Sequence, residues 1–289
     1  MKKVLCAALL CAFSVSLWGC SRSEPSVPSP SSQTASAAAA DSSGTAAASV
    51  TTQMTTAAAN GLRPNTLKAE QFVTDGQFKT YTENGATASA AGIDVSSYSG
   101  SIDWDKVKNA GVTFVMVRLG GRGYGDSGAL YADEQAAAYM RGAQAAGLHT
   151  GGYFFSQATT PEEAREEAAY CREVLGDLTP DYPVAYDWEF IKDDTARTDG
   201  MTAAETTACA RAFCDEIRSF GWTPLLYAGD AEMTAKYDLA QLTDCGVWYC
   251  EYADYPSFPY QIRLWQYTKT AVIDGIEGNV DLDMLFLNQ

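Results

Sequence analysis

The sequence contains only one histidine, His149, and few basic residues. It has 20 Lys and Arg against 36 Asp and Glu, a formal net charge of -16. Nucleic-acid binding depends on clustered Lys and Arg at the phosphates, so this balance argues against a nucleic-acid partner. A Ser-His-Asp triad would have to use His149, which begins a predicted strand at the end opposite to the acidic residues described below. We therefore expect no triad chemistry.

Motifs for metals and nucleotides are also missing. No CxxC or Cys/His spacing typical of a metal site occurs, and "DDTARTDG" lacks the ligand spacing of an EF-hand. The glycine-rich "GGRGYGD" has neither the P-loop lysine nor the spacing of a dinucleotide fingerprint. We expect neither a metal nor a cofactor, and we expect a monomer.

The amino-terminal segment "MKKVLCAALLCAFSVSLWGC" has two lysines and an apolar stretch that is short for a membrane span. Its ending resembles a bacterial lipobox. We therefore expect a lipoprotein signal peptide over residues 1–20, with lipid on Cys20 anchoring the protein outside the cytoplasm; simple secretion is the alternative. Residues 21–60, rich in Ser, Thr, Ala and Pro, predict a flexible tether.

Five cysteines remain in the part of the chain that we expect to fold, so at least one thiol stays unpaired. A disulfide from the first of them to one of the next two is one alternative, and buried thiols are the interpretation that we favour. The five are Cys171, Cys209, Cys214, Cys245 and Cys250.

Apolar, strand-like runs alternate with helical patterns over residues 91–289. Residues 61–90 read instead as a short β-hairpin around Asp75-Gly76. Helices are expected over 104–110, 132–146, 162–175 and 203–220, and strands near residues 93, 115, 152, 186, 225, 248, 264 and 281. This alternation predicts an α/β fold with a parallel sheet. We expect an irregular TIM-like (β/α) barrel in which some later helices are shortened or missing; a doubly wound open sheet is the alternative.

Acidic residues follow the ends of the predicted strands, where barrel enzymes place their functional groups. Asp94 ends the first strand, Asp187 and Glu189 end the fourth, and Asp281 with Asp283 lies in the eighth. The first and eighth strands are neighbours in a closed barrel and the fourth lies opposite. We therefore expect these carboxylates to meet in one cleft.

The spacing of Asp187 and Glu189 predicts a functional pair. Side chains alternate along a strand, so the two carboxylates share one side, with Cα atoms roughly 6.6 Å apart, while Trp188 points the other way. Like charge and desolvation should raise one pKa and leave the other group ionised. Glycosidic cleavage uses such an arrangement, with one acid for the leaving oxygen and one carboxylate for the developing positive charge.

Aromatic residues lie at or near the same strand ends, where flat rings with polar edges would suit sugars. Core packing is the alternative for any one of them. They are Tyr98, Tyr124, Tyr153, Tyr186, Tyr227, Trp248, Trp265 and Tyr267.

The chain from about residue 91 to its carboxyl end resembles the glycoside hydrolase family 25 lysozymes, the Chalaropsis-type N-acetylmuramidases. The motifs occur in the family's order: "GIDVSSYSGSIDWDKVKNAGVTFVMVRLG", "GLHTGGYFFSQATTPEEAREEA", "PVAYDWE", and "LWQYT" followed by "GNVDLDMLF". The resemblance implies an irregular (β/α) barrel. It also implies hydrolysis of the β-1,4 bond between N-acetylmuramic acid and N-acetylglucosamine, with peptidoglycan glycan strands as the partner.

By position, the resemblance implies that Glu189 is the general acid and Asp187 its partner carboxylate. Asp94 and Asp281 match acidic residues on the first and last strands, and Asp283 falls where the family has Asn or Asp. Asp187 would either orient a substrate acetamide or help to activate water. Two other hypotheses remain: a non-catalytic glycan-binding lipoprotein on the same scaffold, and a glycosidase acting on chitin-type oligosaccharides.

Overall fold

The computed structural model describes residues 61–192 and 194–288. The predicted signal peptide, the lipidation site at Cys20 and the predicted tether lie outside these residues. Among the described residues, no helix combines the length and the apolar character that crossing a membrane requires.

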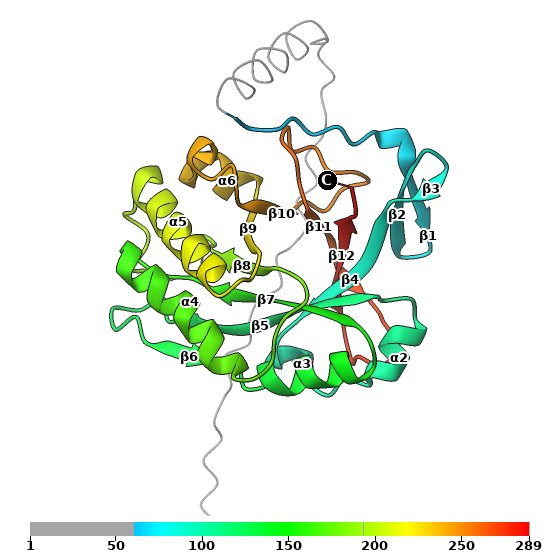
Figure 1. Cartoon of the computed structure of the whole chain (residues 1–289), viewed down its shortest axis with the longest axis horizontal. Helices are drawn as coiled ribbons and strands as arrows, with labels where there is room; N and C mark the ends of the chain where they lie inside the picture. The colour runs from blue at the N-terminus through cyan, green and yellow to red at the C-terminus, as the bar shows by residue number, and fades with distance from the viewer. Residues whose placement is uncertain (1–60, 193, 289) are drawn as a thin grey trace, which may run out of the picture. The chain divides into compact units, whose positions relative to one another are not determined.

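Eight strands close into a barrel, as predicted (Figure 1). Their order around the barrel is β4-β12-β11-β10-β9-β8-β7-β5, and β5 pairs with β4 to complete the circle. The bounds are β4 Ser89–Val95, β5 Phe114–Arg122, β7 His149–Phe155, β8 Val184–Asp187, β9 Pro224–Gly229, β10 Gly246–Cys250, β11 Leu264–Ala271 and β12 Val280–Phe286. A short strand, β6 (Leu130–Ala132), pairs with the end of β5 outside this circle.

The expectation of a wholly parallel sheet is wrong for the last strand. β12 runs antiparallel to both of its neighbours, β11 and β4. Only residues 272–279 connect β11 to β12, whereas a crossover between parallel strands needs about a dozen residues or more. The reversal places the beginning of β12, rather than its end, at the rim where β4 ends, so that Asp281 pairs with Asp94.

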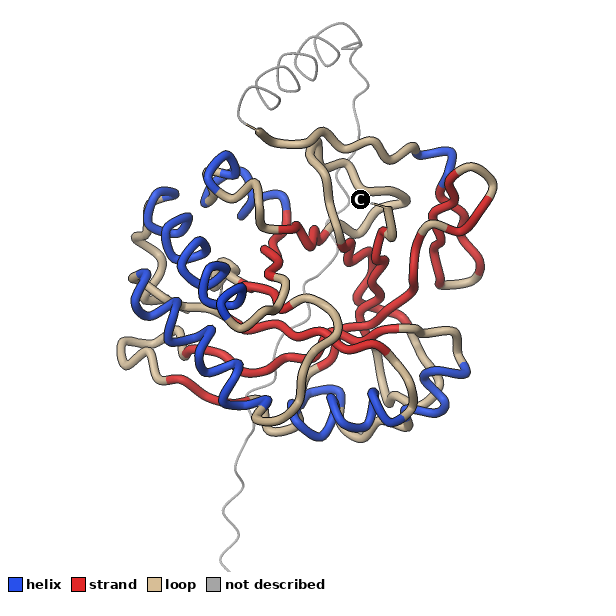
Figure 2. The backbone as a smooth tube through the Cα atoms, in the orientation of Figure 1, coloured by secondary structure: helices blue, strands red, loops and turns tan. Residues whose placement is uncertain are grey.

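Helices cover the outer face of β5 and of β7 to β9 (Figure 2). They are α3 (Ala136–Ala145), α4 (Pro161–Leu175), α5 (Ala203–Ser219) and α6 (Asp230–Lys236). The short helix α2 (Trp104–Asn109) contacts α3, where Trp104 meets Tyr139 edge to face. Thr160 caps α4 ahead of a proline, and Thr202 with Glu205 forms a capping box at α5. The helix α3 starts at Ala136, four residues later than the helix predicted over 132–146.

The amino-terminal extension packs where the later helices are missing. It contains β1 (Phe72–Asp75), β2 (Phe78–Glu83) and β3 (Ala86–Thr87), with an antiparallel hairpin at Asp75-Gly76. Phe72 and Tyr81 pack against Phe286 of β12, and Phe72 also meets Trp265 of β11 edge to face, at 5.6 Å between ring centroids. This small sheet therefore buries apolar surface of the barrel that a helix would otherwise cover.

The apolar residues form two layers that follow the alternation of side chains along the strands. A small cluster fills the barrel interior and includes Phe114, Met116 and Leu225. The larger cluster lies between the strands and the helices or the extension, and includes Val115, Val117 and Phe213. The interior is a packed core, so access to the barrel is confined to its ends.

Candidate active site

A cavity of about 260 Å³ opens at the barrel end where the parallel strands terminate and β12 begins. Its lining is acidic and aromatic: Asp94, Tyr153, Asp187, Glu189, Tyr227, Trp248, Tyr252, Gln266 and Asp281. Four of the five carboxylates that the sequence singled out therefore lie in one cavity, although they are up to 187 residues apart, from Asp94 to Asp281. The convergence follows from barrel closure and from the reversed direction of β12.

Asp187 and Glu189 have different environments within this cavity. Asp187 is the last residue of β8 and is only 5% exposed, and its Oδ1 has no hydrogen-bond partner among the described residues. Glu189 lies two residues beyond, at the solvent-exposed lip. Trp188 points away from both and is buried between Phe190 and Lys236. The alternation of the strand thus continues past its end and holds both carboxyls on one wall.

Burial raises the pKa of Asp187 well above its usual range, and the charges of Glu189 and Asp94 add to the rise, against the guanidinium of Arg118. The pKa of Glu189 is also raised, first by its crowding among protein atoms and then by Glu232. Contact between the two side chains raises the pKa of Asp187 and lowers that of Glu189. The raised pKa values allow the pair to keep a proton at pH values where isolated carboxyls are ionised.

Asp94 and Asp281 form a second pair on neighbouring strands. Burial and the charge of Asp281 raise the pKa of Asp94 well above its usual range. Burial raises the pKa of Asp281 to about 6, against the nearby ammonium of Lys269. Gln266 Nε2 donates to Asp94 Oδ2 at 2.7 Å. These carboxyls therefore keep protons at pH values where an exposed aspartate is fully ionised.

Gln266 is a site residue that the sequence analysis missed. Besides its bond to Asp94, its Oε1 accepts from the hydroxyls of Tyr227 (3.1 Å) and Tyr252 (3.4 Å). It is 5% exposed in the middle of β11. A polar residue flanked by aromatics in a buried strand was the available signal, because such a residue must be hydrogen-bonded to be tolerated.

The predicted aromatic residues divide into three groups: three line the cavity, two are exposed, and three are buried elsewhere. Tyr153, Tyr227 and Trp248 line the cavity, and the indole of Trp248 meets both tyrosines edge to face. Two others, Tyr98 and Tyr124, are exposed and do not contribute to the cavity lining. Arg118 stacks over the Tyr98 ring at 4.8 Å, and burial elsewhere accounts for the remaining aromatics of the set.

Trp265 and Asp283 do not line the cavity, contrary to the prediction that they bind substrate. Trp265 is fully buried on the outer side of β11, where its Nε1 donates to the carbonyl oxygen of Glu251 at 2.8 Å. Because side chains alternate, Gln266 takes the inward position instead. Asp283 lies fully buried below Asp94 and accepts from Trp248 Nε1 at 2.8 Å. Tyr186 and Tyr267 are also buried in the outer layer.

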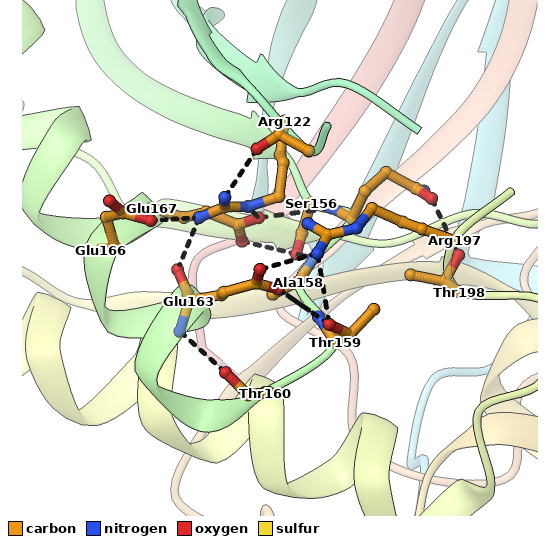
Figure 3. Close-up of polar contacts among 12 residues, drawn as sticks. Arg122, Ser156, Ala158, Thr159, Thr160, Glu163, Glu166, Glu167, Arg197 and Thr198 are labelled. Atoms are coloured by element: carbon orange, nitrogen blue, oxygen red, sulfur yellow. Dashed lines mark hydrogen bonds and ion pairs between the residues drawn. The ribbon is translucent and has the colours of Figure 1, made fainter. Parts of the chain in front are cut away.

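A network of charged side chains supports the β8 side of the mouth (Figure 3). Arg122, at the end of β5, donates to Glu167 (2.8 Å) and Glu166 (2.7 Å) of α4. Ser156 connects this network to the cavity: its Oγ donates to Glu167 at 2.6 Å, and its backbone N–H donates to the carbonyl oxygen of Asp187 at 2.7 Å. The backbone beside Asp187 is thus held by a buried ion pair.

The same network fixes the loop that follows Glu189. Arg197 donates to Glu163 at 2.7 Å, and Thr198 donates to Gln157 at 2.8 Å (Figure 3). Burial raises the pKa of Glu167 to about 7 in spite of its bonds to Ser156 and Arg122. The network therefore combines a rigid support with a carboxyl that titrates near neutral pH.

The sequence model of the glycosyl hydrolases family 25 matches residues 93–276, more than half of the chain. The autolytic lysozyme of Clostridium acetobutylicum is 26% identical over 193 residues, which cover 66% of this chain and 54% of that protein. Lysozyme M1 of Streptomyces globisporus is 35% identical over 71 residues, 25% of this chain and 22% of that one. The chain thus spans about half, or less, of the length of these relatives.

Solved structures share the fold. The modular autolysin LytC of Streptococcus pneumoniae superimposes with a TM-score of 0.60 at 22% identity, over 74% of this chain and 51% of that one. A family 25 glycosyl hydrolase of Bacillus anthracis does so with a TM-score of 0.59 at 18% identity, over 75% and 96%. With its barrel, its acidic mouth and the match over residues 93–276, the chain belongs to glycosyl hydrolase family 25.

Proposed function

We propose that this protein is a peptidoglycan hydrolase, an N-acetylmuramidase that cleaves the β-1,4 bond between N-acetylmuramic acid and N-acetylglucosamine. The observation that carries the proposal is the gathering of Asp94, Asp187, Glu189 and Asp281 in one aromatic-lined cavity of a family 25 barrel. Tyr153, Tyr227 and Trp248 would offer sugar rings flat apolar faces beside these acids.

In the proposed reaction, Glu189 protonates the leaving glycosidic oxygen. Its place at the exposed lip puts it within reach of a bound glycan strand, whereas Asp187 is buried beneath it. The proton that the pair shares would pass through Glu189 to the leaving oxygen. Asp187 is then ionised beside the positive charge that develops on the sugar, where a carboxylate stabilises the transition state more than the ground state.

Asp187 would also accept a hydrogen bond from the substrate side. Its Oδ1 is buried and has no hydrogen-bond partner among residues 61–192 and 194–288. A substrate acetamide N–H or an attacking water would satisfy this oxygen, and a buried acceptor gains most from such a partner. Asp94 and Asp281 would set the charge of the opposite wall, and Asp94, through Gln266, would orient Tyr227.

The test uses the full chain and purified peptidoglycan, with the fragments analysed by mass spectrometry. We expect new reducing ends on N-acetylmuramic acid. Glu189→Gln should remove most of the activity, since general acid catalysis contributes about 10² to 10⁴-fold, and it should leave folding unchanged. Asp254→Asn, at a side chain that is 98% exposed, is the matched control and should keep full activity.

Three outcomes would contradict the proposal in different ways. Binding to cell wall without turnover, unchanged in Glu189→Gln, would indicate a glycan-binding protein. Cleavage of chitin oligomers in preference to peptidoglycan would indicate that chitin-type oligosaccharides are the substrate. New reducing ends on N-acetylglucosamine would show that a different glycosidic bond is cleaved.

We propose further that lipid on Cys20 anchors the protein to the outer face of a membrane. The support is the sequence of residues 1–20 and the spacer over 21–60. Cys20→Ser should move the protein from the detergent phase to the aqueous phase in a phase-separation assay on cells that express the full chain. Equal partitioning of both forms would argue against the anchor.

A further inference from the structure

Two cysteines meet at the base of the barrel, away from the acidic cavity. Cys214 is fully buried on α5, and Cys245 lies in the turn before β10 with 8% of its surface exposed. Cys214 lies between Arg211 and Arg218 on one face of α5, at spacings of three and four residues, and both arginines reach the sulfur of Cys245. The two cysteines are 31 residues apart in the sequence, and no sequence pattern indicated that they would meet.

Two arginines of α5 surround the sulfur of Cys245. Arg218 donates to its Sγ at 3.3 Å and Arg211 approaches it at 3.7 Å. Both guanidinium groups are held in place by Asp215 and Asp244, with contacts between 2.7 and 3.2 Å. A sulfur between two fixed cations is stabilised as a thiolate, the form that acts as a nucleophile.

Contact with Cys214 and the two arginines lower the pKa of the Cys245 thiol, against its burial and the nearby charge of Asp244. Contact with Cys245 and burial raise the pKa of Cys214. Because both arginines direct N–H donors at Cys245 Sγ, the pair consists of one activated sulfur and one thiol held next to it. This asymmetry is typical of an attacking and a resolving cysteine.

Cys245 also borders a cavity. It lines a cavity of about 630 Å³ at the end of the barrel opposite to the carboxylates, where residues 62, 181 and 222 also contribute to the wall. Cys214 does not contribute to this lining. A small disulfide that enters the cavity would thus meet Cys245 first.

We propose that Cys245 and Cys214 form a redox-active thiol pair that reacts with low-molecular-weight disulfides and closes to an intramolecular disulfide. The Cys245 thiolate attacks one sulfur of the small disulfide, forms a mixed disulfide and releases one small thiolate. Cys214 then loses its proton to that thiolate, attacks the Cys245 sulfur and releases the second small thiolate, which takes a proton from water. Two protein thiols are oxidised and one small disulfide is reduced to two thiols.

The other described cysteines lack this environment. Burial raises the pKa of Cys250 to about 11, although it is more exposed than Cys245. Burial likewise raises the pKa of Cys209, to about 12, and that of Cys171. Cys250 is therefore an internal control, because it is the more exposed of the two residues, whereas Cys245 has the lower thiol pKa.

The first experiment needs no variant. The reduced full chain is treated with limiting iodoacetamide at pH 7.5, and digestion with trypsin and chymotrypsin separates the peptides of Cys245 and Cys250. We expect alkylation of Cys245 to be at least about tenfold faster, since one unit of pKa changes the thiolate fraction about tenfold. Faster reaction at the more exposed Cys250 would overturn the proposal.

The second experiment follows the disulfide itself. Hydroxyethyl disulfide should convert the wild-type protein to a species with a peptide linkage between Cys214 and Cys245. Cys214→Ser should stop at a mixed disulfide on Cys245, and Cys245→Ser should leave Cys214 reduced. Absence of the linked peptide, or a mixed disulfide on Cys214 in Cys245→Ser, would refute the assignment of roles.

The third experiment tests the arginines. Arg218→Gln should slow the reaction of Cys245 about tenfold or more. Arg165→Gln is the matched control on α4, because Arg165 is half exposed and pairs only with Glu162 among the described residues. Equal rates in the two variants would show that the guanidinium does not activate the sulfur.

Discussion

The buried ion pair between Arg122 and Glu167 leads to a prediction that runs against the usual view of salt bridges. Glu167 is 0% exposed and bonded to Arg122 and Ser156, yet its pKa lies at about 7 rather than 4.5. Burial thus disfavours the carboxylate more than its partners favour it, as the desolvation of buried ions allows. The charged form of Glu167 should therefore destabilise the fold.

The sign and size of this effect follow from the linkage between proton binding and folding. Because the folded-state pKa is raised, the folded protein binds more protons than the unfolded chain between pH 4.5 and pH 7. The contribution of Glu167 is fully present below pH 4.5 and is lost as the pH rises through about 7. A difference of about 2.5 units, at 1.36 kcal/mol each, amounts to about 3 kcal/mol in the free energy of unfolding.

Glu167→Gln removes this titration and keeps the shape of the side chain. We expect the unfolding free energy of wild type, minus that of the variant, to fall by about 3 kcal/mol between pH 4.5 and pH 8. Urea unfolding followed by tryptophan fluorescence measures it. Glu166→Gln is the control, since Glu166 also contacts Arg122 but its side chain is 60% exposed. Parallel pH profiles for wild type and Glu167→Gln would refute the reasoning.

Two further predictions concern the barrel. Asp281→Asn should raise the thermal midpoint of unfolding at pH 7.5, because the folded-state pKa of Asp281 is about 6 instead of 3.8, and it should lower the activity. The gain in thermal midpoint should vanish below pH 4. An unchanged thermal midpoint at pH 7.5 would contradict this prediction. Gly92→Ala should lower the unfolding free energy by about 1 to 3 kcal/mol, because its Cβ would lie 2.2 Å from the buried ring of Phe114. Gly125→Ala, with open space at the Cβ, is the control, and equal stability of the two variants would contradict this account.

The strand positions could be predicted from the sequence because each barrel strand is a short apolar run between helical patterns. All eight predicted centres fall inside or at the edge of an observed strand. The carboxylates were found by the same logic, since alternation on β8 and the location of strand ends fix where Asp187 and Glu189 point. Local patterns were sufficient here because one face of each strand must be buried.

One error of the sequence-based prediction concerns a strand that is buried on both faces. β11 is buried on both faces, so alternation alone did not show whether Trp265 or Gln266 faces inward. The direction of β12 was predictable in principle, because eight residues, 272–279, are too few for a crossover helix. The contact between Cys214 and Cys245 joins a helix to a turn, and no spacing rule in the sequence describes such a pair.

The reversed last strand also bears on how an acidic protein could bind a glycan that carries carboxylates. Antiparallel pairing of β12 with β4 stacks Asp281, Asp94 and Asp283 from the mouth downward, and burial raises the pKa of all three. Because their pKa values are raised, these three aspartates keep protons at pH values where the formal net charge counts each of them as negative. The negative potential at the mouth is therefore weaker than three ionised aspartates would create, and an anionic glycan would meet correspondingly less repulsion there.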